Sequence, residues 1–122
     1  MRKLLIILIL VFFSGIVLGY GSDKKPESWY VKKYCEGQIE VKLEDRTRCD
    51  CVTDTHAIEF DFAKKYTEAI GQSLHYARLT KKQAGIYLIV TSDKDMKYWE
   101  NLKGAIEYHK LPITLIKLIR EK

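Results

Sequence analysis

The stretch of residues 48–76, RCDCVTDTHAIEFDFAKKYTEAIGQSLHY, decides the fold predicted for this chain. Residues 48–52 and 57–61 have the patterns of short strands and are separated by a polar turn. From residue 62 to about residue 79 the apolar residues recur with a helical period, which predicts the main core-facing helix. The apolar face of that helix comprises Phe62, Tyr66, Ile70, Leu74 and Ala77. Two strands are therefore expected to lead directly into a long helix.

The polar side chains of the same stretch suit the binding of a cation and a phosphate. Asp50 and Glu59 lie on the two predicted strands, and two carboxylates side by side form a site for a hard divalent cation. On the helix, Lys65, Gln72 and Tyr76 fall along one stripe. A lysine and a glutamine beside a metal are residue types that phosphodiester hydrolysis requires. The pattern predicts a site for that chemistry.

Further elements on both sides of this stretch complete one small domain. We expect a helix at residues 29–35, a strand at 38–43, a strand at 86–90, a helix at 96–108 and a strand at 112–119. Ser28 is expected to cap the first helix and Gly37 to end it. Because a helix and a basic turn at residues 81–85 connect the strands 57–61 and 86–90, these two strands should be parallel.

The N-terminal residues have the pattern of an export signal. Arg2 and Lys3 precede an apolar segment at residues 4–18, and Gly19 and Gly21 suit a signal-peptidase site. We expect a signal peptide at 1–21, a linker at 22–28 and a single domain at 29–122, in a periplasmic or secreted protein. The alternative is an uncleaved N-terminal membrane anchor; if the signal is cleaved, no stable membrane span remains.

Charge is a weak indicator of the partner. The 122-residue chain carries a formal net charge of +5, and removing Arg2 and Lys3 leaves +3. A charge of that size is compatible with binding nucleic acid but does not argue for it, because phosphate-binding proteins usually have a larger or more clustered basic excess.

Three cysteines lie in the part of the chain that export would place in an oxidising compartment. One disulfide and one free thiol are expected among Cys35, Cys49 and Cys51. Because side chains alternate along a strand, Cys49 and Cys51 should share a face and Asp50 should point to the other. A bridge from Cys35 to either would tie the first helix to the sheet. The alternative is a redox or metal-binding C-x-C pair, to which only Cys35 and the distant His56, His75 and His109 could add ligands.

The element order and the residues quoted above resemble the PD-(D/E)XK nuclease superfamily, which includes restriction endonucleases, archaeal Holliday-junction resolvases and tRNA-splicing endonucleases. The resemblance covers about residues 29–90. It implies an α/β (α+β) fold with a restriction-endonuclease-like αβββαβ core and a mixed central sheet, here followed by an additional helix and strand. In that family an aspartate on the second core strand and a Glu-x-Lys on the third bind a divalent metal. Asp50 and Glu59 stand at the two acidic positions.

Two further family features have counterparts in this chain. A branch related to helicase-associated nucleases has Gln-x-x-x-Tyr on the following helix, and Gln72 and Tyr76 match it. Many members also use a glutamate on the first helix. Glu36 stands near that position, and Glu40 competes with it for the role.

The chain departs from the family at the lysine of the Glu-x-Lys motif, where it has Asp61. An aspartate cannot stabilise the anionic transition state as a lysine does, but it could be a further metal ligand or an outer-shell base. Members of the superfamily move the lysine to the neighbouring helix. By helical angle Lys65 lies on the stripe of Gln72 and Tyr76, whereas Lys64 points away, so Lys65 is the predicted substitute.

Two functions remain open from the sequence. The first is an exported nuclease that uses Mg²⁺ or Mn²⁺ and acts on nucleic acid outside the cytoplasm. The alternative is a catalytically inactive domain of the same fold that acts as an exported binding protein of the cell envelope and binds a protein, a metal or envelope material. Asp61 and the export signal favour the alternative. Nucleases of this fold often pair to cut two strands, and the apolar C-terminal strand offers an interface for a homodimer.

Overall fold

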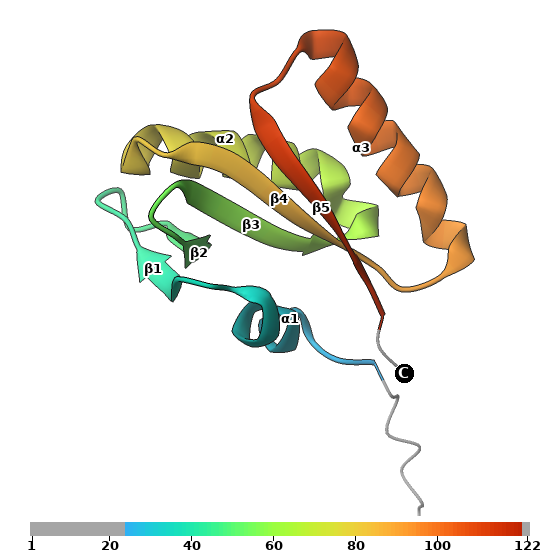
Figure 1. Ribbon diagram of the computed structural model, residues 1–122, viewed down its shortest axis with the longest axis horizontal. Coiled ribbons are helices and arrows are strands. Elements are labelled where there is room, and N and C mark those ends of the chain that lie inside the picture. Colours follow the sequence, from blue (N-terminus) through green and yellow to red (C-terminus); the bar gives the residue numbers. More distant parts are fainter. Residues whose placement is uncertain (1–23, 121–122) are drawn as a thin grey trace, which may run out of the picture.

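The computed structural model describes residues 24–120 (Figure 1). The predicted signal peptide lies outside these residues. Within the described part, no helix is both long and apolar enough to span a bilayer.

The described residues form a mixed five-stranded sheet and three α-helices in the predicted order of helix, three strands, helix, strand, helix and strand. The elements are α1 Glu27–Tyr34, β1 Gln38–Lys42, β2 Arg48–Val52, β3 His56–Phe62, α2 Tyr66–Thr80, β4 Gln83–Val90, α3 Met96–His109 and β5 Ile113–Ile119. Short 3₁₀ turns, η1 Ala63–Lys65 and η2 Asp93–Asp95, precede α2 and α3.

Several boundaries differ from those predicted. The first helix begins at Glu27, directly after Pro26, so Ser28 lies inside the helix and does not cap it. Proline suits the start of a helix because its φ is already near the helical value and it has no N–H to leave unpaired. Strand β4 begins at Gln83, inside the predicted basic turn, because Gln83 already pairs with His56 of β3.

The sheet has the strand order β1-β2-β3-β4-β5. Strands β1 and β2 are antiparallel, as are β2 and β3, whereas β4 is parallel to both β3 and β5. The prediction that β3 and β4 are parallel is therefore confirmed. Helices α2 and α3 cover one face of the sheet, and the short α1 lies against the other face (Figure 1).

The face with which helix α2 contacts the sheet coincides only in part with the predicted stripe, of which Tyr66 and Ile70 pack against the core. The residues of the predicted apolar stripe are only half-buried, whereas Ala69, Ser73 and Tyr76 are the buried residues of the helix. Small side chains at positions 69 and 73 let the helix lie close to the strands, and the hydroxyl of Ser73 donates a hydrogen bond to the carbonyl of Ile70 at 3.0 Å. The helix is consequently rotated so that Tyr76 points toward the sheet.

The disulfide joins Cys35, at the end of α1, to Cys51 of β2, with a Cα–Cα distance of 5.7 Å. The expectation of one bridge from Cys35 is confirmed. The expectation that Cys49 and Cys51 share a face is wrong, because Cys51 packs with Tyr30 on the α1 side and Cys49 packs with Tyr76 on the α2 side. Pairing of β2 with β3 covers only Cys51 and Val52, so the strand is not held in that register at Cys49.

Removing this disulfide should lower the free energy of unfolding by about 3 kcal/mol, because a bridge that closes a loop of roughly 15 residues restricts the unfolded chain by that amount. The two cysteines are 16 residues apart. Urea unfolding of the Cys35→Ser/Cys51→Ser variant, compared with the oxidised protein, measures the loss. A reducing agent should leave the variant unchanged. Equal stability of variant and oxidised protein would contradict the prediction.

Candidate functional site

The candidate site begins where β2 and β3 separate. Regular pairing of these strands ends at Cys51 and Ile58. Beyond that point the backbone N–H of Phe60 donates a hydrogen bond to Oδ2 of Asp50, at 2.8 Å. The carboxylate of Asp50 thus occupies the place of a main-chain acceptor, and this contact fixes its position between the strands. Burial raises the pKa of Asp50, and the Phe60 N–H opposes that rise.

Glu59 lies beside Asp50 and is almost completely buried, with 5% of its surface exposed. Burial, followed by the negative charge of Asp50 and a hydrogen bond to it, raises the pKa of Glu59 to about 10. At neutral pH Glu59 is therefore protonated and donates to Asp50. Among residues 24–120 no N–H or O–H group donates to Oε2 of Glu59, which is buried. Asp50 and Glu59 thus form an acid pair in which Oε2 of Glu59 has no hydrogen-bond donor among the described residues. A cation could replace the proton that the pair shares.

Asp61 and Glu27 form a second acid pair next to the first. Burial raises the pKa of Asp61 to about 6, and the positive charge of Lys65 opposes the rise. The N–H of Phe62 donates to Oδ1 of Asp61 at 2.9 Å. Burial and the charges of Asp50 and Asp61 raise the pKa of Glu27 to about 7, and Glu27 is also hydrogen-bonded to Asp61. The four carboxyl groups come from α1, β2 and β3.

Residues at the start and middle of α2 complete the site. Lys65 ends the 3₁₀ turn before the helix, and its charge lowers the pKa values of both Asp61 and Glu27. Tyr76 is buried and hydrogen-bonded to Gln72. Burial raises the pKa of Tyr76, and the charge of Glu59 adds to that rise. The charge of Lys65 therefore acts on the second acid pair, while Tyr76, bonded to Gln72, interacts with Glu59.

Most residues predicted for the site from the sequence thus lie within one connected cluster, through the hydrogen bonds and charges given above: Asp50, Glu59, Asp61, Lys65, Gln72 and Tyr76. Their chemical roles stay predictions. Lys64, which helical angle directs away from them, is exposed and lines a separate cavity.

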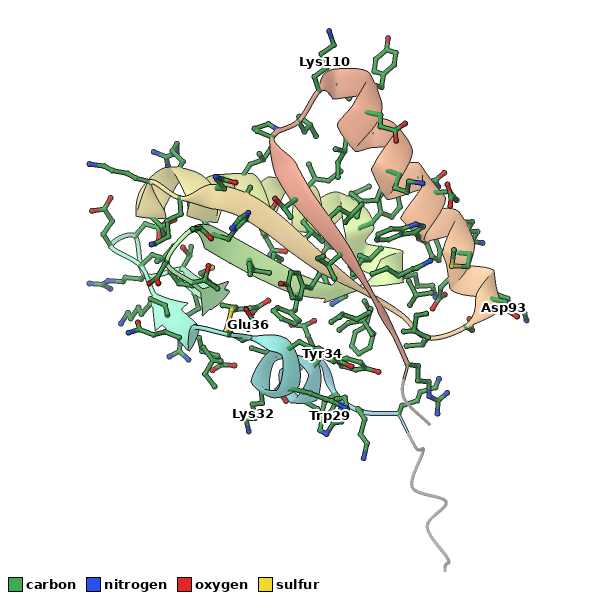
Figure 2. The ribbon with its side chains drawn as sticks, viewed as in Figure 1. Trp29, Lys32, Tyr34, Glu36, Asp93 and Lys110 are labelled. Carbon is green, nitrogen blue, oxygen red and sulfur yellow. A yellow bond between two sulfur atoms is a disulfide. The ribbon has the colours of Figure 1, made fainter. Side chains whose placement is uncertain are left out.

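The acid of the first helix is placed differently from the prediction. Helix α1 ends at Tyr34, so Glu36 is not on it; Glu36 is exposed beside the disulfide and lines a cavity of about 690 Å³ with His56 (Figure 2). Glu40 lies close enough to Asp50 for its charge to raise the pKa of that residue. The helix residue in the cluster is Glu27. Pro26 was the signal that could have found it, because proline is common at helix starts.

The carboxylates of the cluster could supply one or two ligands to a magnesium ion but do not surround one. Within the described part of the chain, no group of three or more His, Cys, Asp or Glu side chains is arranged to hold a metal ion. The predicted three-carboxylate set with Asp61 is therefore absent as a ligand group in residues 24–120. Mg²⁺, however, is commonly bound by one or two carboxylates together with water and substrate phosphates. Asp50 and Glu59, with its unpartnered Oε2, fit that mode.

The cysteines and histidines do not form a second chemical site. Cys51 is used in the disulfide, and burial raises the pKa of the Cys49 thiol to about 11, which keeps it protonated and unreactive at neutral pH. The ring nitrogens of His56 contact the hydroxyls of Thr55 and Thr114. His75 contacts Asp45 at 2.6 Å. These contacts weigh against a thiol-redox function or a thiolate metal site in residues 24–120.

No family model, curated protein or solved structure matches this chain. The resemblance to the PD-(D/E)XK superfamily therefore stays a prediction, and any functional conclusion depends on the geometry of the site itself.

Proposed function

We propose that this domain is a metal-dependent nuclease that hydrolyses phosphodiester bonds. The observation that carries the proposal is the pair of half-buried Asp50, fixed by the N–H of Phe60, and buried Glu59, whose Oε2 is unpartnered among the described residues, with Lys65 and the Gln72–Tyr76 pair in the same cluster. Two carboxylates for a cation, a nearby lysine for the developing negative charge and polar groups for positioning are what metal-assisted phosphodiester hydrolysis needs.

The arrangement of the elements supports the same proposal. A helix, an antiparallel three-strand unit, a crossover helix and a parallel strand are the order expected of a restriction-endonuclease-like core. In this proposal α3 and β5 are additions that extend the sheet past β4. In the same proposal, Asp50 of β2 and Glu59 of β3 correspond to the metal-binding acids of that fold.

Each residue of the cluster has a role that its position allows. A bound Mg²⁺ or Mn²⁺ would polarise the phosphate and lower the pKa of bound water. Asp50 and Glu59 would hold the cation once Glu59 had released to solvent the proton that it shares with Asp50. Asp61, with a pKa near 6, is largely ionised at neutral pH and suits the role of a base for the attacking water. Lys65 stabilises the anionic transition state, while Tyr76 and its neighbour Gln72 orient the phosphate.

Asp61 also favours the second candidate function, an inactive domain that serves as an exported binding protein of the cell envelope. The family's lysine is missing at that position, and a fold can outlast its chemistry. In that case the acid cluster would remain as a structural or binding feature without hydrolysis.

Cleavage of labelled single-stranded and duplex DNA by the purified protein, with Mg²⁺ or Mn²⁺, separates the two candidates. Cutting should require metal and should fall about 10³-fold or more in the Glu59→Ala variant, because a lost metal ligand removes several kcal/mol of transition-state stabilisation. Glu107→Ala, at an exposed glutamate of α3, is the matched control and should cut normally. Metal-dependent cutting that persists in Glu59→Ala, or no cutting by the wild-type protein, would reject the proposal.

A further inference from the structure

A second cavity, distinct from the acid cluster, lies at the carboxyl ends of the parallel strands. It has a volume of about 300 Å³, at the lower end of the range of small-molecule sites. Four cationic side chains line it: Lys24, Lys25, Lys64 and Arg120. They come from three parts of the sequence, and the segment before α1 passes close to the end of β5 (Figure 1). The fold therefore gathers positive charge here from both ends of the described chain.

The cavity has little negative charge to balance these cations. Asp95 is the carboxylate among its lining residues, and it is already bonded by Thr91, whose hydroxyl donates to Oδ2 at 2.8 Å. The backbone N–H of Thr91 donates to the same oxygen at 3.3 Å. Across residues 24–120, none of the four cations forms an ion pair with a carboxylate. Such uncompensated charge around a small volume attracts an anion.

Aromatic rings form part of the lining. Tyr30 is buried, and its ring packs edge-on against that of Phe62, with 6.3 Å between the centroids. The ammonium group of Lys25 lies 5.7 Å from the ring centroid of Trp29, which is labelled in Figure 2. The rings of Tyr30 and Phe62 give the cavity an apolar wall. Lys25, beside the ring of Trp29, places a positive charge at its edge.

Several residues that line the cavity are neighbours in sequence of residues in the acid cluster. Lys64 directly precedes Lys65, and Phe62 directly follows Asp61. On α1, Tyr30 lies one turn after Glu27. The two sites are therefore built from the same segments of the chain, and the proposal below requires a bound strand to reach both.

We propose that the cavity binds the terminal phosphate monoester of a nucleic-acid strand, a role that rests on the proposed nuclease function. A cavity of this volume can hold a single phosphate group but not several nucleotides of a strand. A phosphate monoester carries a charge of roughly −1.5 to −2 at neutral pH, so it gains more from the four cations than an internal diester with one charge does. The acid cluster nearby would then act on bonds close to a phosphorylated end.

Binding without metal tests the site separately from cleavage. The affinity of the full protein for labelled single-stranded oligonucleotides is measured by fluorescence anisotropy in EDTA, with a phosphate or a hydroxyl at the 5′ end and, in a second pair, at the 3′ end. We expect about tenfold tighter binding of one phosphorylated form, the equivalent of about 1.4 kcal/mol. The preference should disappear in Lys64→Gln/Arg120→Gln. It should persist in Arg78→Gln/Lys103→Gln, which loses the same charge elsewhere.

The outcomes separate this proposal from the nuclease proposal. Equal affinity for phosphate and hydroxyl ends would overturn the phosphate site even if the protein cuts DNA. An equal loss of preference in both double variants would show a general charge effect and would also overturn it. A preference that persists in a protein without cleavage would keep the site and reject the nuclease. Binding of the wild-type protein to anionic lipid vesicles that depends on Lys64 and Arg120, without any end preference, would assign the cavity to a membrane surface.

Discussion

The metal-free protein should lose stability as the pH rises from about 5 to about 9, and Glu59→Gln should remove most of that loss. The pKa of Glu59 is raised in the folded state from an ordinary value of 4.5 to about 10. Between these values the unfolded chain releases a proton that the folded protein keeps. The unfolded state then binds fewer protons, so the free energy of unfolding falls with rising pH.

Two further groups contribute to the same slope in narrower windows. The folded-state pKa of Glu27 is about 7 and that of Asp61 about 6, each above its ordinary value. Their share of the stability is complete below the ordinary values and is lost by about pH 7. Above that pH, Glu59 alone among the three should carry the decline. The total change should be on the order of a few kcal/mol, because one pKa unit corresponds to about 1.4 kcal/mol and coupling between the acids reduces the sum.

Glutamine at position 59 cannot ionise, yet its amide can still donate to Asp50. Urea unfolding in EDTA across this pH range should therefore give a nearly flat profile for Glu59→Gln above pH 7, with the variant more stable than the wild type at about pH 9. Exposed Glu107 provides the control, and Glu107→Gln should keep the wild-type slope. Equal slopes in wild type and Glu59→Gln would show that Glu59 does not hold a proton in the folded state.

Magnesium should oppose the fall in the free energy of unfolding that the wild type shows as the pH rises. A cation that displaces the shared proton binds more tightly as the pH rises, and a ligand that binds only the folded state stabilises it. The gain in stability on adding Mg²⁺ should therefore increase with pH in the wild type and be small in Glu59→Gln. The two sets of unfolding curves link the proton at Glu59 to the proposed metal site without any need for catalysis.

The order of the elements and the pairing of β3 with β4 could be predicted because they depend on local periods and on the connection between strands. The period of 2 changes to 3.6 near Phe62, the continuous apolar run at residues 86–90 indicates a buried strand, and a helical crossover implies parallel strands. A disulfide from Cys35 to the second strand was expected from the count of three cysteines and from the pair at positions 49 and 51, and the bridge to Cys51 confirms it.

Contacts across the sheet could not be predicted in the same way. The face of α2 that packs on the sheet is set by Ala69 and Ser73, whose small size allows close approach. A prediction from the distribution of large apolar residues gives little weight to small or polar ones. The position of Cys49 depends on where β2 and β3 part, which alternation alone does not reveal. Glu27 was missed because the predicted helix began two residues too late. In each case packing between distant elements decided the outcome.

Lys65→Met should lower kcat for DNA cleavage by about 10²- to 10³-fold with little change in KM, if Lys65 replaces the lysine that Asp61 displaces. The charge of Lys65 already acts on Asp61 and Glu27 in the metal-free protein, so its ammonium group lies near the place where negative charge develops. Lys64→Met is the matched comparison. It removes the same charge from the preceding residue, which lines the cavity proposed to bind phosphate, and should raise KM with little effect on kcat.

Moving the lysine back to its family position makes the test of Lys65 sharper. Residue 61 follows Glu59 by two positions on β3, so both side chains point to the same face of the sheet. In the Lys65→Met background, Asp61→Lys would place an ammonium group in the same cluster and should recover part of the lost kcat. Circular dichroism must show that the double variant is folded. Full activity in Lys65→Met alone would refute the role of Lys65, because catalysis would then not need its ammonium group.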